Sequence, residues 1–104
     1  MNFQDKVSGG NLVVVDIETS GLRSDEDNPA EIIEISAIKF KDGQELARYH
    51  SYIKNKTPLS KEISALTEIT DEMLSGAPDI QTVMNEFCSF AKGALIAAYN
   101  APFD

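Results

Sequence analysis

The chain has 104 residues, which is enough for one small domain. Nine basic residues against 17 acidic ones give a net charge of −8, so a basic groove for long nucleic acid is excluded, and chemistry on phosphates would need divalent cations. No membrane-spanning run, no secretory signal and a single cysteine lead us to expect a cytoplasmic protein with no membrane partner and no internal disulfide.

Three strands are predicted in the first half of the chain. After a polar tail over residues 1–10, the β-branched run 11–18 is typical of a strand, and residues 20–29 form a turn and a charged loop. Residues 31–40 predict a second strand, Asp42-Gly43 a tight hairpin turn, and residues 45–54 a third, antiparallel strand. The third strand is polar enough to be an edge.

Helices are predicted next. Pro58 ends the strand pattern, and Ser60 and Thr70 are suited to cap two short helices. From Asp79 onwards, apolar residues at helical spacing predict the buried face of a longer helix that stops at Gly93. That face comprises Ile80, Val83, Met84, Phe87, Cys88 and Ala91. We therefore expect the Cys88 thiol to be buried packing and not a nucleophile.

A last strand is predicted over the wholly apolar residues 94–99, which is typical of a strand covered on both faces. Asn100 and Pro102 resemble the opening of another helix. The order of elements predicts an α/β domain with a mixed sheet. Because the chain stops within a supersecondary unit, we expect residues 11–104 to be the N-terminal part of a domain.

Two carboxylates stand two residues apart at the carboxyl end of the first strand. The period of a strand places Asp16 and Glu18 on the same face, at the edge where α/β sheets bind ligands. Like charges so placed favour a hard divalent cation, Mg²⁺ or Mn²⁺. Asp104 approaches both if the first and last strands are neighbours. An isolated Asp-x-Glu is more often a solvated strand end.

The surrounding motifs carry a specific resemblance. Two segments resemble two of the three motifs of the DnaQ-like (DEDD) 3′→5′ exonucleases: VVVDIETSGL and AAYNAPFD. In the first, Asp16 to Gly21 match the pattern Asp-x-Glu-Thr-[Thr/Ser]-Gly. In the second, Asn100 to Asp104 match the pattern Asn-Ala-x-Phe-Asp. The stretch 62–87 also resembles the linker of that family. Tyr99 stands where the second motif often has histidine, and the third motif, a histidine followed by an aspartate, is absent.

The resemblance implies a ribonuclease H-like mixed sheet of order 3-2-1-4-5 and metal-dependent release of nucleoside monophosphates from a 3′ end. It implies two ions, with Asp16 bridging both, Glu18 on the water-bearing ion and Asp104 on the other. Thr19, Gly21 and Leu22 would receive the terminal nucleotide, and Asn100 and Phe103 would also contact substrate. The general base is expected beyond residue 104.

Within this family the chain is similar to the proofreading domain or epsilon-like subunit of bacterial DNA polymerase III, so the expected partners are a 3′ end of single-stranded DNA and a DNA polymerase subunit. The alternatives are an RNA-trimming enzyme of the oligoribonuclease or ribonuclease T kind, and a catalytically incomplete fragment whose exposed last strand pairs with another chain. His50 is interpreted as a surface residue away from the acids, and Glu31 and Glu34 as surface or capping groups. Residues 24–27 lack the spacing of a calcium loop.

Overall fold

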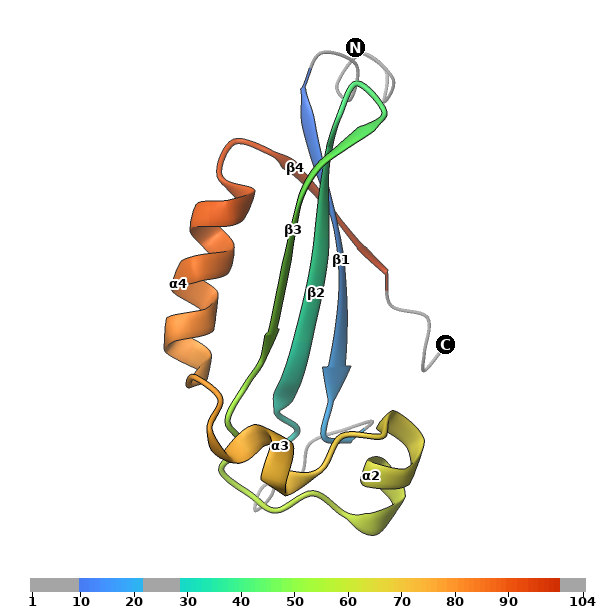
Figure 1. The fold of residues 1–104 in the computed structure, drawn as a ribbon, viewed down its shortest axis with the longest axis vertical. Coiled ribbons are helices and arrows are strands. Elements are labelled where there is room, and N and C mark those ends of the chain that lie inside the picture. The colour runs from blue at the N-terminus through green and yellow to red at the C-terminus, as the bar shows by residue number, and fades with distance from the viewer. Residues whose placement is uncertain (1–9, 22–28, 100–104) are drawn as a thin grey trace.

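A computed structural model describes residues 10–21 and 29–99 (Figure 1). The elements are β1 (Asn11–Thr19), β2 (Ile32–Lys41), β3 (Gln44–Tyr52), α2 (Lys61–Thr67), α3 (Asp71–Ser75), α4 (Ile80–Ala91) and β4 (Leu95–Tyr99). The predicted tail, the charged stretch 24–27 and the helix opening at Asn100 fall wholly or almost wholly outside the described residues. None of the helices in the described ranges has the length and apolarity that a bilayer crossing demands.

The strands form a mixed sheet in the order β3-β2-β1-β4. β2 runs antiparallel to both β1 and β3, whereas β4 runs parallel to β1. The predicted α/β class and the first four positions of the expected strand order are therefore confirmed. The hairpin turn between β2 and β3 is also confirmed, since Asp42 (φ 51°) and Gly43 (φ 80°) both adopt the left-handed backbone that such turns require.

Each helix begins at a side-chain cap. Ser60 Oγ accepts a hydrogen bond from the Ile63 N–H at 3.1 Å, and Thr70 Oγ1 accepts one from the Met73 N–H at 3.2 Å. Asp79 Oδ1 does the same for the Thr82 N–H at 2.8 Å, at the start of α4. These contacts satisfy amides that have no partner in the first turn, so the helix starts predicted from the sequence are confirmed.

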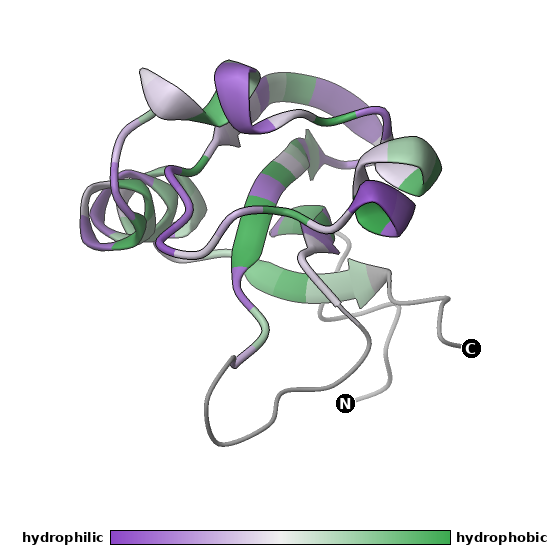
Figure 2. Cartoon of the chain, turned by 90° about the horizontal axis from the view of Figure 1, so that it is seen from below, coloured by the Kyte–Doolittle hydropathy of each residue, from purple (hydrophilic) through white to green (hydrophobic). Residues whose placement is uncertain are grey.

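Two apolar clusters hold the elements together. The larger lies between the sheet and α4, and Figure 2 shows this helix nearly end-on beside the strands. Its buried members are Val13, Val15, Ile35, Ala37, Ile53, Val83, Phe87 and Ala91. The smaller joins the start of β2 to α3 through Ile33, Ile69 and Leu74. The larger cluster fixes which face of β1 is covered by α4.

The burial of two elements, α4 and β4, was predicted wrongly. Cys88 is exposed, and Ile80 and Met84 are 36% and 37% exposed, because α4 meets the sheet along one narrow line through Val83, Phe87 and Ala91. The prediction that the last strand is covered on both faces also differs from the structure. Residues 95–98 are exposed. Among the described strands β4 pairs only with β1, and α4 contacts β3, which forms the opposite edge of the sheet.

Candidate metal and nucleotide site

Asp16 and Glu18 lie on one face of β1 near its carboxyl end. Val13 and Val15 of the same strand are buried in the larger cluster, so strand alternation directs Asp16 and Glu18 to the opposite face. Asp16 is exposed and Glu18 is partly buried. The sequence prediction that these two carboxylates share a face agrees with this arrangement of β1.

Two further polar residues line the same face, one strand away. In the register of β1 and β2, Glu18 stands opposite Glu34, and Asp16 stands opposite Ser36. Glu34 Oε2 lies 2.6 Å from Nε2 of His50 on β3. The interpretation of His50 as an exposed residue of the edge strand is confirmed, and its side chain pairs with Glu34, one strand away from Asp16 and Glu18. Only the register brings His50 to Glu34 and Glu34 to Glu18, and a single sequence does not reveal register.

The charges on this face disfavour ionisation of Glu18. Partial burial raises the pKa of the Glu18 carboxyl above its usual value, and the neighbouring charges of Asp16 and Glu34 raise it further. A carboxylate whose charge is destabilised in this way gains from a nearby cation. The electrostatics of the site thus favour the binding of positive charge at the end of β1.

A divalent metal fits the donor chemistry found here. Carboxylate oxygens such as those of Asp16 and Glu18 are the ligands that Mg²⁺ and Mn²⁺ prefer. Within residues 10–21 and 29–99, no group of three or more acidic, histidine or cysteine side chains is arranged to hold a metal. The described residues therefore supply two candidate ligands, and the third predicted ligand, Asp104, lies outside them.

The turn after β1 is held by local hydrogen bonds. Thr19 Oγ1 donates to the Gly21 carbonyl oxygen at 2.7 Å. The Ser20 N–H donates to the carbonyl oxygen of Glu31 at 2.8 Å, and the Glu31 N–H donates to Ser20 Oγ at 2.8 Å. The pairing of β1 with β2 is irregular between Glu18 and Thr19, and such bulges bend a strand and re-aim its side chains.

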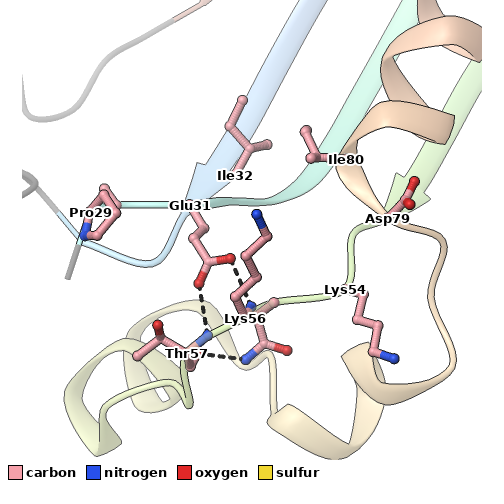
Figure 3. Close-up of a pocket in the computed structure, with 10 residues that line it drawn as sticks. Pro29, Glu31, Ile32, Lys54, Lys56, Thr57, Asp79 and Ile80 are labelled. Carbon is pink, nitrogen blue, oxygen red and sulfur yellow. Dashed lines mark hydrogen bonds between the residues drawn. The ribbon is translucent and has the colours of Figure 1, made fainter. Parts of the chain in front are cut away.

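A pocket of about 840 Å³ adjoins this turn (Figure 3). Its lining comes from the start of β2, the segment after β3 and the start of α4, and comprises Pro29, Ala30, Glu31, Ile32, Lys54, Asn55, Lys56, Thr57, Asp79 and Ile80. One wall is apolar through Ile32 and Ile80, and both lysines come from the segment after β3. The pocket has a size common for small ligands, and no motif or spacing in the sequence predicts it.

The described part of the chain does not include every predicted site residue. Leu22, Asn100, Phe103 and Asp104 lie outside the described residues. The parallel pairing of β1 and β4 puts Asp16 opposite Tyr99, so the chain leaves β4 beside Asp16. The strand neighbours that the predicted approach of Asp104 requires are therefore present.

Comparison with known proteins gives consistent results. The family model described as Exonuclease matches residues 13–104. The chain is 39% identical over its whole length to a PolC-type DNA polymerase III of Thermotoga petrophila, and 41% identical over 93 residues to that of Halalkalibacterium halodurans. It spans only 7% and 6% of the lengths of these two relatives.

Solved structures share the fold. Exonuclease X in complex with 5′ overhanging duplex DNA superimposes with a TM-score of 0.70 at 28% identity, over 89% of this chain and 51% of that one. Exonuclease I superimposes with a TM-score of 0.74 at 15% identity, over 89% of this chain and 22% of that one. The sheet and helices described above are thus those of the ribonuclease H-like fold of exonucleases.

Proposed function

Because the chain belongs to the exonuclease family, we propose that it is the exonuclease part of a cytoplasmic replicative DNA polymerase that removes nucleotides from the 3′ end of DNA. The pair Asp16 and Glu18 carries the proposal, since it lies on the open face of β1 within the matched residues. Similarity to PolC-type polymerases supports DNA, and not RNA, as the substrate, and supports a proofreading role.

The roles of the residues follow from their chemistry. Asp16 and Glu18 would hold Mg²⁺ or Mn²⁺, with Asp104 as the expected third ligand. A bound pair of such ions supplies charge that stabilises a phosphodiester undergoing hydrolysis. Thr19 and Gly21 would receive the terminal nucleotide at the turn after β1, together with Leu22, Asn100 and Phe103. The DNA polymerase would be the partner that delivers the strand end.

Metal-dependent hydrolysis tests this proposal. The full-length protein, with Mn²⁺ or Mg²⁺ and single-stranded DNA labelled near its 5′ end, should shorten the strand from the 3′ end and release nucleoside monophosphates. Asp16→Asn and Glu18→Gln should each lower the rate by at least about a hundredfold, because each removes a ligand charge. Glu45→Gln is the control, since Glu45 is exposed and bound to Arg48.

The outcomes separate the alternatives. Equal rates for Asp16→Asn and the unmodified protein would place the site elsewhere. Faster hydrolysis of an RNA strand of matched sequence would favour the hypothesis of an RNA-trimming enzyme over that of a proofreading enzyme. Saturable Mn²⁺ binding without hydrolysis by any form of the protein would favour a catalytically incomplete unit.

A further inference from the structure

Glu31 joins three segments that are far apart in the sequence. Its main chain exchanges two hydrogen bonds with Ser20, both 2.8 Å long, at the turn that follows β1. Its carboxylate accepts from the Lys56 N–H at 2.8 Å through Oε1 and from the Thr57 N–H at 3.1 Å through Oε2. Figure 3 shows this side chain reaching from the start of β2 to the segment after β3.

The carboxylate contacts contribute to holding that segment in place. The strand pairing of β3 ends at Tyr52, and just past it the Ile53 and Lys54 N–H groups donate to the main-chain carbonyls of Ile33 and Pro78. Further along this segment, the Lys56 and Thr57 N–H groups both donate to the Glu31 carboxylate. Hydrogen bonds from amides to a carboxylate are stronger than those to a neutral acceptor. Glu31 is therefore held firmly at its far end.

The main-chain contacts transmit this anchoring to the turn. Thr19 is the last residue of β1 that pairs with β2, and it does so across an irregular register. Beyond it, the reciprocal bonds between Ser20 and Glu31 fix the position of the turn. Asp16 and Glu18, in contrast, are placed by the β1–β2 ladder itself, opposite Ser36 and Glu34.

We propose that Glu31 is a positioning residue that sets the turn at Ser20-Gly21 for the terminal nucleotide, by anchoring that turn to Lys56 and Thr57. This inference rests on the proposed function, in which the same turn receives the strand end. It predicts that Glu31 affects substrate binding while leaving the metal ligands in place. Glu31 would touch neither substrate nor metal.

Three variants of the full-length protein test the role of Glu31. Glu31→Ala removes both acceptors, so the KM for single-stranded DNA should rise roughly three- to tenfold while Mn²⁺ affinity stays within about twofold. Glu31→Gln keeps one oxygen acceptor for the two N–H groups and should give an intermediate KM. Glu45→Ala is the control, because Glu45 lies beside the β2–β3 turn, at the opposite end of the sheet (Figure 1).

Hydrogen exchange gives a readout that does not depend on activity. In Glu31→Ala the Lys56 and Thr57 amides should exchange faster, and the Ser20 amide should do so as well. Faster exchange at Lys56 and Thr57 with no change at Ser20 or in KM would overturn the proposal, because Glu31 would then only hold the segment after β3. An unmodified protein that lacks Mn²⁺-dependent hydrolysis would refute the proposed function instead, and the exchange at Ser20 would still decide the coupling.

Discussion

Replacing Leu74 with alanine should strongly destabilise the fold. Leu74 is fully buried in the small cluster with Ile33 and Ile69, which joins α3 to the start of β2. Losing its three outer carbons costs about 2.4 kcal/mol at about 0.8 kcal/mol per carbon, and the cavity left behind raises the loss to about 3–5 kcal/mol. A domain of this size has only about 5–15 kcal/mol of stability in total. We therefore expect the thermal midpoint to fall by about 10–25 °C.

Leu66 provides the matched control, since it lies in the preceding helix and is 78% exposed. The change Leu66→Ala should alter the free energy of unfolding by about 0.5 kcal/mol or less. Urea and thermal unfolding of the 104-residue chain, followed by far-ultraviolet circular dichroism, compare the two variants with the unmodified chain. Equal shifts for Leu66→Ala and Leu74→Ala would refute the assignment of Leu74 to a packed core.

Three smaller changes test local features. Glu18→Gln should weaken Mn²⁺ binding and should stabilise the metal-free protein at neutral pH, because the raised pKa of Glu18 means that its ionised form is disfavoured in the fold. Unfolding curves at several pH values should show the unmodified protein gaining the same stability as pH falls through the raised pKa. The hydrogen bond from the Thr82 N–H lowers the pKa of the Asp79 carboxyl. The stabilisation of α4 by the Asp79 carboxylate is therefore complete above the pKa of the unfolded chain and is lost as pH falls through the lowered pKa. Asp79→Asn should keep the cap without this pH dependence in the same unfolding experiments. Gly43→Ala should cost roughly 1–2 kcal/mol through its left-handed backbone alone, since an added Cβ meets no atom within 4 Å, and a loss measured near zero by urea unfolding would contradict the turn geometry.

Local signals in the sequence were enough for the elements of the fold. The β-branched run of β1, the Asp42-Gly43 turn and the caps at Ser60 and Thr70 act within a few residues, so one sequence suffices to recognise them. The burial of Cys88 was predicted wrongly because helical spacing gives the direction of a face but not the width of its contact with the sheet.

The surroundings of the candidate site depended on non-local contacts. Glu34 and His50 come together only through the pairing of β2 with β3, and Glu31 reaches Thr57 across 26 residues of sequence. Propensity and spacing say nothing about such pairs. The two adjacent acids of β1 were predictable because a strand alone determines that they share a face.

The parallel pairing of β1 with β4 has a consequence for the order in which the chain folds. β1 can pair with β2 across a loop of about a dozen residues, whereas its contacts with β4 join residues about 80 positions apart, and such distant contacts form slowly. During synthesis, Asp16 would therefore leave the ribosome and pair with β2 well before Tyr99 has been added. Slowing the formation of the β1–β4 pair should delay the maturation of the site without delaying the β1–β2–β3 sheet.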